Sequence, residues 1–356
     1  MKAYLILEDG TVFEGKSIGS QKEIISEIVF NTSVVGYLET LTDPSYAGQA
    51  VCMTFPLQGN YGICLEDTES DRAYASGFIA REICEEPSNF RSGKSLEAFL
   101  TEQGVTGIYG IDTRYLTRIL REKGTMNGMI TTKKYALEEV LSKIKAYRVS
   151  GVVEKASCKE KHTVGDVGAK YKIALLDFGE KRNIARCLAE RDCLVTVYPA
   201  WTKAEEILKD APDGIMLSNG PGDPAECIEI IREVKKLYDS DTPIFAICLG
   251  HQLMALATGA KTKRLKYGHR GGNQPVKCLA EDRVYVTSQN HGYYVDEKSL
   301  DPAVATPAFV NVNDGTNEGL VYVGKNIFTV QFHPESCPGP LDTRFLFDRF
   351  LGMLKK

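Results

Sequence analysis

The sequence predicts an α/β protein of two domains, in which a strand-rich α+β domain precedes a domain built on a parallel sheet. The first observation is the length of 356 residues, since one domain commonly holds about 150. The second is a change of pattern: strands and helices do not alternate regularly in residues 1–150, whereas they do in residues 172–356. The third is the stretch 151–171, which lacks an apolar period and predicts a surface linker.

The first domain begins with a predicted hairpin. Residues 2–7 form an apolar strand, Asp9-Gly10 is a turn signal, and residues 11–14 return as the second strand. The other predicted elements are a strand at 24–30 and helices at 95–103 and 113–123. Because these elements do not repeat as strand–helix units, an α+β arrangement is the better prediction.

The second domain alternates between apolar strands and amphipathic helices. The predicted strands are 172–179, 194–198, 214–220, 243–247 and 327–332. The predicted helices are 183–191, 204–210, 226–238 and 250–258. This alternation favours a parallel sheet that is covered on both faces. In such sheets ligands bind beyond the carboxyl ends of the strands, so the strand ends are where chemistry is expected.

Composition excludes several classes of function. The net charge of −4 provides no basic field for nucleic acid, and no apolar run reaches the roughly 18 residues of a membrane helix. The first residues lack the long apolar core of a signal peptide, so a cytoplasmic protein is expected. The ten cysteines include no C-x-x-C pair, and in such a chain they are expected to be reduced.

Cys248 stands at the most informative strand end. It follows the apolar strand 243–247 and precedes a helix, with the small residues Ala246 and Gly250 on either side. A helix N-terminus favours a thiolate, and the free N–H of Leu249 could bind a developing oxyanion. The alternative is a buried core cysteine, which is the commoner situation for a lone Cys.

A histidine and a glutamate follow another strand. The predicted strand 327–332 ends in His333-Pro334-Glu335, and residues two apart on a strand face the same side. Glu335 could therefore orient the ring of His333, and His333 could accept the proton of a thiol. A satisfied histidine at a strand end is the alternative interpretation. Together, Cys248, His333 and Glu335 favour nucleophilic catalysis.

These motifs resemble a known family. The segments FAICLGHQ, NGPGDP and HPE are similar to class I (triad) glutamine amidotransferases, whose nucleophile motif is G-x-C-x-G-x-[QE], with Ala246 in place of the first glycine. The segments EIVFNTSVVGYLETLTDPSYAGQAV, FPLQGNYG and GIYGIDTRYLTRILREKGTMNGMI resemble the small subunit of carbamoyl phosphate synthetase. So do GAKTKRLKYGHRGGNQPV and TSQNHGYYV, and the matched blocks run from about residue 1 to residue 350.

The resemblance implies a fold and a mechanism. The first domain would be the β/β/α unit of these small subunits, and the second a flavodoxin-like glutaminase domain. Cys248 would attack the carboxamide of glutamine, His333 would shuttle the proton, and Glu335 would orient His333. The N–H groups of Gly220 and Leu249 would form the oxyanion hole.

The resemblance also implies a set of glutamine contacts. These positions are Ser45, Gly220, Gly222, Leu249, Gln252, Asn290, Gly292 and Tyr293. Ser45 belongs to the first domain, so a contact from it would place the active site at the domain interface. The alternative for Ser45 is a simple turn serine in Asp43-Pro44-Ser45.

A large synthetase subunit is the implied partner. It would use ammonia, bicarbonate and Mg-ATP to make carbamoyl phosphate for arginine or pyrimidine biosynthesis, in a heterodimer or a higher oligomer. No cofactor is expected in this chain, because the phosphate-binding pattern G-x-x-x-x-G-K-[ST] is absent. No metal is expected either, since no cluster has zinc spacing; structural roles are predicted for His251, His269 and His291.

Two other functions remain open at this point. The chain could serve another synthetase, such as anthranilate synthase or a nucleotide amidase, although residues 1–150 argue against this. It could also be a catalytically silent assembly or regulatory module. The presence of Cys248, His333 and Glu335 argues against the silent module.

Overall fold

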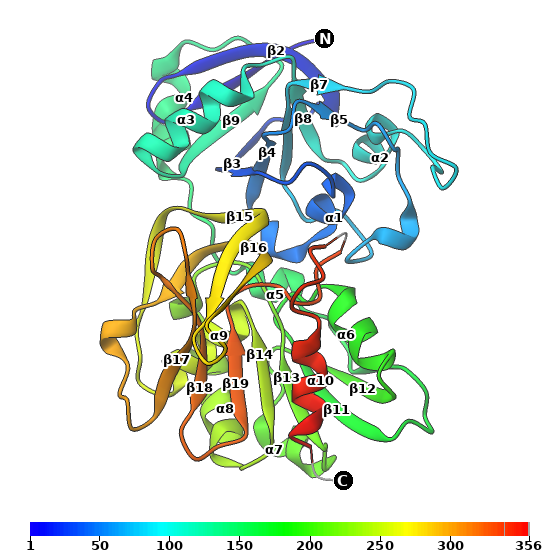
Figure 1. Ribbon diagram of the computed structural model, residues 1–356. Coiled ribbons are helices and arrows are strands. Elements are labelled where there is room, and N and C mark those ends of the chain that lie inside the picture. The colour runs from blue at the N-terminus through cyan, green and yellow to red at the C-terminus, as the bar shows by residue number, and fades with distance from the viewer. Residues whose placement is uncertain (338, 355–356) are drawn as a thin grey trace. The chain divides into compact units, whose positions relative to one another are not determined.

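The computed structural model describes residues 1–337 and 339–354, and it divides into two compact units (Figure 1). The first unit comprises Met1–Ser150 and the second Gly151–Lys356. The stretch 151–171, predicted as a linker, lies within the second unit and contains α5 (Val152–Ala156) and β10 (His162–Val164). β10 pairs antiparallel with β12 (Cys193–Pro199), so part of this stretch is an edge of the second unit's sheet.

The first unit is a closed barrel with the strand order β1-β2-β8-β6-β4-β3-β9. Its strands are β1 (Lys2–Leu7), β2 (Val12–Gly19), β3 (Ile24–Asn31), β4 (Gln49–Met53), β6 (Gly77–Ala80), β8 (Thr106–Tyr109) and β9 (Met126–Thr131). The predicted hairpin is the pair β1–β2. The barrel closes because β1 also pairs with β9, more than a hundred residues later in the chain.

Helices and short pairings surround this barrel. They are α1 (Tyr37–Thr42), α2 (Leu96–Glu102), α3 (Thr113–Lys123), α4 (Leu137–Ala146) and the two-stranded pair β5 (Leu57–Gln58) and β7 (Glu82–Ile83). α3 shows why the sequence forms a helix here. The Asp112 side chain accepts a hydrogen bond from the Tyr115 N–H at the start, and Gly124, with φ of 101°, ends it. Leu116 and Leu120 lie one turn apart and are buried.

The second unit contains a sheet with the order β10-β12-β11-β13-β14-β19-β18-β17-β15-β16. The remaining strands are β11 (Tyr171–Asp177), β13 (Gly214–Leu217), β14 (Ile244–Ile247), β15 (Thr262–Cys278), β16 (Arg283–Val295), β17 (Ala305–Asn311), β18 (Asn317–Tyr322) and β19 (Ile327–Val330). Strands β12, β11, β13, β14 and β19 are mutually parallel. The sheet as a whole is mixed, because β10 and the strands from β15 to β18 pair antiparallel.

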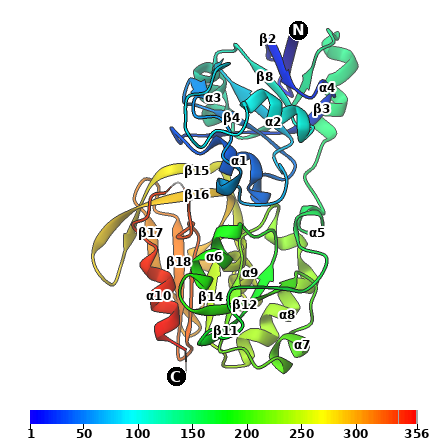
Figure 2. The same cartoon turned by 90° about the vertical axis from the view of Figure 1, so that its right-hand side faces the viewer.

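The helices of the second unit cover both faces of the sheet (Figure 2). They are α6 (Arg182–Ala189), α7 (Ala204–Lys209), α8 (Ile228–Asp239), α9 (Leu249–Ala257) and α10 (Phe345–Gly352). Side chains alternate along β11: Ala174 and Leu176 pack with α7, α8 and α9, while Ile173 and Leu175 pack with α6 and α10. A strand buried on both faces explains the continuous apolar run in the sequence.

Two further properties concern the whole chain. Among the residues that the structure describes, no helix is both long enough and apolar enough to cross a membrane. In the same part of the chain none of the cysteines forms a disulfide, and most of their side chains are buried.

Candidate active site

Cys248 lies at a sharp turn between β14 and α9. Its φ of 52° and ψ of −103° are unusual for a residue with a side chain, and it is 2% exposed. Gly250 allows α9 to pack closely, because a Cβ at this position would lie 2.5 Å from the Leu217 carbonyl oxygen. Ala246 is fully buried in the core, so the methyl group that replaces the family's glycine fits there. The strained turn expected of a nucleophile is present.

His333 follows the strand next to the one that carries Cys248. β14 and β19 are parallel, with Ile247 opposite Val330, and the Cys248 N–H donates a hydrogen bond to the Val330 carbonyl oxygen (2.8 Å). The carboxyl ends of adjacent parallel strands meet at one edge of a sheet. Cys248 and His333 therefore belong to the same edge, as the strand order requires.

His333 and Glu335 form a buried pair. Both are fully buried, and His333 Nδ1 lies 2.7 Å from Glu335 Oε1. Because a carboxylate only accepts, Nδ1 carries the proton, which leaves Nε2 as the basic nitrogen of the neutral ring. Within the described residues, this buried Nε2 has no hydrogen-bond partner. The contact is made in the turn after β19, which ends at Val330, and not by alternation along a longer strand.

Lys181 is a third member of this group, and no sequence motif pointed to it. Its Nζ lies 3.1 Å from Glu335 Oε1, and its side chain is 8% exposed. Burial alone would raise the pKa of Glu335, but the charge of Lys181, followed by His333, lowers it to about 2. The carboxyl group is therefore ionised at neutral pH despite complete burial.

The loop that carries Lys181 is held by its own hydrogen bonds. Asp177 Oδ1 accepts from the N–H groups of Gly179 (2.8 Å) and Glu180 (2.6 Å). The Lys181 N–H donates to Asn219 Oδ1 at 3.0 Å. Lys181 lies just beyond the carboxyl end of β11, so the rule that directed attention to Cys248 and His333 also applied here.

Gly220 and Leu249 occupy positions suited to an oxyanion hole. A Cβ on Gly220 would collide with the Phe178 carbonyl oxygen and lie 2.7 Å from Leu249 Cδ2, so only glycine fits. Leu249 is the first residue of α9, where N–H groups have no acceptor within the helix. The structure brings these two residues together, while their contact with an oxyanion stays a prediction.

The segment 290–293 of β16 reaches the nucleophile. Cys248 Sγ lies 3.8 Å from the Asn290 carbonyl oxygen. The Tyr293 carbonyl oxygen accepts from Gln252 Nε2 (2.8 Å) and from His291 Nδ1 (2.7 Å). Gln252 Nε2 also lies 2.9 Å from the side-chain oxygen of Gln331. Gln252, expected as a glutamine contact, thus holds the backbone of another expected contact.

The remaining expected contacts are glycines and one serine. Gly222 has φ of 92°, a conformation that favours glycine, and a Cβ on Gly292 would come no closer than 3.5 Å to any neighbour. Ser45 lies in the first unit, where its N–H donates to Asp43 Oδ1 (2.9 Å) in a short 3₁₀ turn. The turn is present, and a contact between Ser45 and glutamine stays a prediction.

The surroundings of His251 indicate a structural role. It lies in α9, it is fully buried, and its Nδ1 is 2.7 Å from Thr329 Oγ1. Burial lowers its pKa to about 3, so the ring is neutral across the physiological range.

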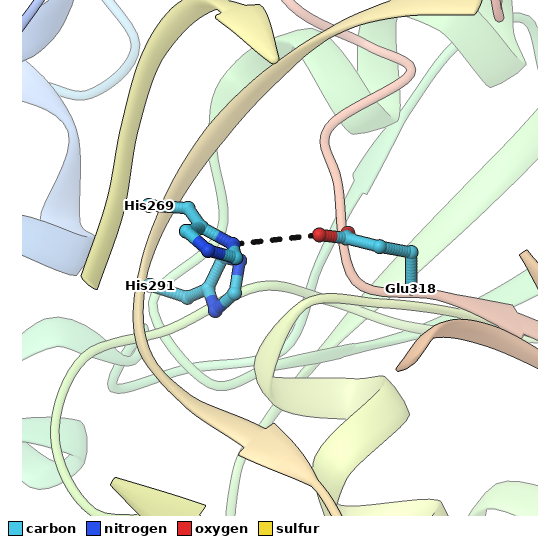
Figure 3. A group of neighbouring side chains, drawn as sticks. All are labelled: His269, His291 and Glu318. Atoms are coloured by element: carbon cyan, nitrogen blue, oxygen red, sulfur yellow. Dashed lines mark ion pairs between the residues drawn. The ribbon is translucent and has the colours of Figure 1, made fainter. Parts of the chain in front are cut away.

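One cluster among the described residues has the composition of a metal site. His269, His291 and Glu318 are all buried, and each offers a donor atom within 4.8 Å of the others (Figure 3). No zinc spacing is visible in the chain because Glu318 is remote in sequence from the two histidines. The cluster arises from the pairing of β15 with β16, which places His269 opposite His291, and from β18.

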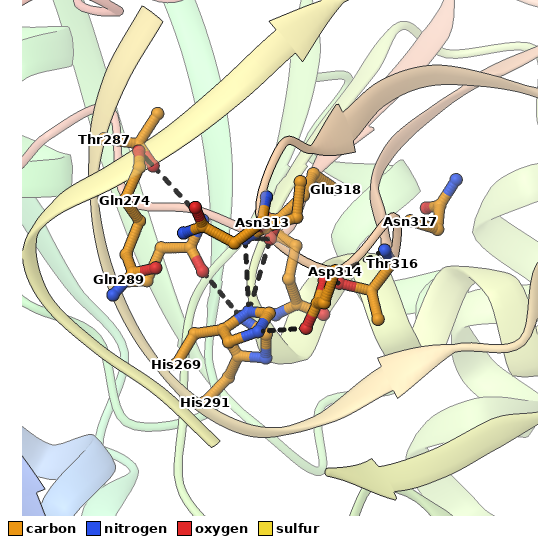
Figure 4. Close-up of polar contacts among 12 residues, drawn as sticks. His269, Gln274, Thr287, Gln289, His291, Asn313, Asp314, Thr316, Asn317 and Glu318 are labelled. Atoms are coloured by element: carbon orange, nitrogen blue, oxygen red, sulfur yellow. Dashed lines mark hydrogen bonds and ion pairs between the residues drawn. The ribbon is translucent and has the colours of Figure 1, made fainter. Parts of the chain in front are cut away.

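The donor atoms of this cluster also have polar neighbours (Figure 4). His269 Nε2 lies 2.8 Å from Asp314 Oδ2, and His269 Nδ1 lies 3.4 Å from Glu318 Oε1. Burial alone would lower the pKa of His269, but these two carboxylates raise it to about 9. His291 Nδ1 donates to the Tyr293 carbonyl oxygen (2.7 Å), which leaves Nε2 of this neutral ring as an acceptor, 3.0 Å from the side-chain amide of Gln289. We interpret the cluster as an ion-pair network that supports the segment 290–293.

Comparison with known proteins agrees with this geometry. Residues 174–353 match the family model described as glutamine amidotransferase class-I, so the second unit is a domain of that class. Residues 5–130 match the model described as carbamoyl-phosphate synthase small chain, CPSase domain. The chain belongs to the family of carbamoyl phosphate synthase small chains.

Individual relatives cover almost the whole chain. The carbamoyl phosphate synthase small chain of Clostridium perfringens is 52% identical over 99% of this chain and 99% of its own length. The carbamoyl phosphate synthase small chain of Syntrophotalea carbinolica is 48% identical over 100% of this chain and 98% of its own length. A solved structure of a glutamine amidotransferase from Thermotoga maritima covers 46% of this chain and 76% of its own, with 20% identity and a TM-score of 0.39.

Proposed function

We propose that this chain is the glutamine-hydrolysing small subunit of a carbamoyl phosphate synthase. The observation that carries the proposal is the strained turn at Cys248, placed at the sheet edge that also holds the buried pair of His333 and Glu335. A buried histidine with one nitrogen fixed by a carboxylate and the other unoccupied is the form that a general base takes. Family membership supplies the substrate, glutamine.

The proposed reaction proceeds in two halves. The Cys248 sulfur attacks the carboxamide carbon, and His333 Nε2 receives the thiol proton. The Gly220 and Leu249 N–H groups stabilise the oxyanion of the tetrahedral intermediate. His333 then gives the proton to the leaving nitrogen, so ammonia departs and a glutamyl thioester remains. His333 next removes a proton from water, which attacks the thioester and releases glutamate while the sulfur regains its proton.

The proposed partner is a large synthetase subunit that consumes the ammonia. In the proposed division of labour it uses Mg-ATP and bicarbonate, whereas this chain holds no cofactor. The assembly would be a heterodimer or an oligomer of heterodimers in the cytoplasm. Enclosed delivery has a chemical motive, because free ammonia would be protonated, and therefore unreactive, at neutral pH.

The proposed glutamine site uses the residues named above. Asn290, Gly292 and Tyr293 would contact the substrate from β16, and Gln252 supports this segment through the Tyr293 carbonyl. Gly222 and Ser45 complete the proposed set. Support for Ser45 comes only from the family resemblance.

The test uses Cys248→Ser in the complex with the large subunit. We expect glutamine-dependent synthesis of carbamoyl phosphate to be lost and synthesis from added ammonia to persist. Cys278→Ser is the matched control, since Cys278 is also buried in the second unit but lies in β15. If Cys248→Ser retains glutamine-dependent synthesis, or if both activities disappear in a folded complex, the proposed function is wrong.

A further inference from the structure

Lys181 and His333 contact the same oxygen atom of Glu335. Lys181 Nζ lies 3.1 Å from Glu335 Oε1, and His333 Nδ1 lies 2.7 Å from the same atom. The other carboxylate oxygen, Oε2, is buried and has no hydrogen-bond partner within the described residues. A single carboxylate oxygen of Glu335 therefore contacts both basic groups, Lys181 and His333.

We propose that Lys181 is a positioning residue of the glutaminase site, which holds Glu335 in place and limits how strongly this carboxylate stabilises the protonated form of His333. The inference rests on the proposed function and deepens it. A general base must give up its proton as readily as it accepts one. A buried carboxylate with no other counter-charge would hold the imidazolium form too firmly for that exchange.

Other ionisable groups lie on the elements around the pair, among them Asp177 and Glu180 in the loop of Lys181 and the buried Arg270 opposite Asn290. Cys248 is at the neighbouring strand end, and Cys187 on α6 has a pKa that burial raises, so its thiol is neutral. Arg344 lies 3.1 Å from Cys187 Sγ and pairs with Glu190. Burial lowers the pKa of His291 on β16, so this ring is also uncharged. Among the described residues, Lys181 is thus the cation in direct contact with the carboxylate of the pair.

The expected effect follows from the geometry. Since both nitrogens touch Oε1, they are separated by no more than the sum of the two contacts, about 6 Å. At this separation and an effective dielectric constant of about 20, one unit charge changes a protonation equilibrium by about two pH units. Removing a positive charge favours the protonated form of a neighbouring base, so the shift is toward higher pH.

The backbone of Glu335 is held from the same loop. Asn183 Nδ2 donates to the Glu335 carbonyl oxygen, and Asn183 follows Lys181 by two residues. The loop between β11 and α6 therefore contacts both the main chain and the side chain of Glu335. This is the arrangement expected of a segment that positions the carboxylate.

The chain offers a control lysine–glutamate pair in which the carboxylate is buried and the lysine, with a side chain 60% exposed, is not. Lys203 lies just before α7 and beyond the end of β12, as Lys181 lies just before α6 and beyond β11. Its Nζ is 3.3 Å from Oε1 of Glu233, whose side chain is 8% exposed. Lys203→Met removes one lysine partner of a buried glutamate away from the proposed triad, while Lys236 still pairs with Glu233.

The experiment compares Lys181→Met, Lys181→Arg and Lys203→Met in the full complex. The measurement is kcat/KM for glutamine hydrolysis as a function of pH, with ammonia-dependent synthesis as the test of folding. We expect the acidic limb of the profile to move up by about two pH units in Lys181→Met only. Lys181→Arg, which keeps the charge, should retain the wild-type limb even where its rate is reduced.

Contrary results are distinct from a failure of the proposed function. A uniform loss of rate in Lys181→Met with an unmoved limb would mean a purely structural role, and an equal shift in Lys203→Met would mean a general charge effect. Should Lys181→Met not fold, Lys181→Gln and the pH dependence of Cys248 alkylation by iodoacetamide give the same comparison without turnover. Absence of glutaminase activity in the wild-type complex would instead refute the proposed function.

Discussion

Gly250→Ala tests whether the turn at Cys248 depends on the close packing of α9. The added Cβ would lie 2.5 Å from the Leu217 carbonyl oxygen and 2.8 Å from Leu217 Cβ, whereas ordinary contact begins at 3.4 Å. The start of α9 must therefore move by about 1 Å, which also strains the bond from the Gly250 N–H to the Ser218 carbonyl (3.0 Å). A misplacement of this size can reduce a rate by about a hundredfold.

The assay is kcat/KM for glutamine hydrolysis by the full complex, with ammonia-dependent synthesis measured in parallel. We expect hydrolysis to fall by about a hundredfold and stability by about 1–3 kcal/mol. Gly352→Ala in α10 is the control, because nothing lies within 4 Å of its added Cβ, and it should leave both properties unchanged or slightly increase stability. Wild-type hydrolysis in Gly250→Ala would refute the argument that the backbone at Leu217 fixes the position of Cys248.

Two further predictions concern the buried charges. Glu335→Gln should reduce kcat/KM for glutamine by about a thousandfold or more, because the amide cannot hold the same tautomer of His333. Glu233→Gln is the control. Equal losses of kcat/KM in the two variants would contradict the role assigned to Glu335. His269 should stabilise the fold most strongly below its ordinary pKa of 6.5, and this contribution should be lost as the pH rises through about 9, since its folded-state pKa is the higher one. Thermal unfolding of wild type and His269→Asn should therefore differ by at most about 3 kcal/mol at low pH and converge above pH 9; a pH-independent difference would contradict the assignment.

The parallel strands were predictable because they are local features of the sequence. Each is an apolar run between helices, and the residue after the run at 243–247 is Cys248. The barrel was not predicted, because its closure depends on the pairing of β1 with β9, which no local pattern records. The antiparallel strands beyond β19 were also missed. β15 is rich in glycine and basic residues and pairs with β16 through irregular register, so it lacks a clear alternation.

Part of the candidate site was predictable because its residues stand next to local sequence patterns. Cys248, His333 and Glu335 stand in short motifs next to strands, whereas Lys181 stands in a polar loop with nothing unusual about its neighbours. Glu318 illustrates the opposite problem. In the sequence it belongs to the polar stretch DGTNEG, yet its side chain is fully buried beside His269. Burial of a charge depends on partners that only the tertiary structure supplies.

The place of the segment 290–293 has a thermodynamic consequence. This segment is part of β16, where Asn290 is opposite Arg270 and His291 is opposite His269 in the ladder with β15. A flexible loop would lose conformational freedom when it closed on a small molecule, and that loss would weaken binding. Here the main chain is already ordered by its ladder, so the proposed glutamine site would present a preorganised surface. Association should therefore carry little entropic cost from this part of the protein.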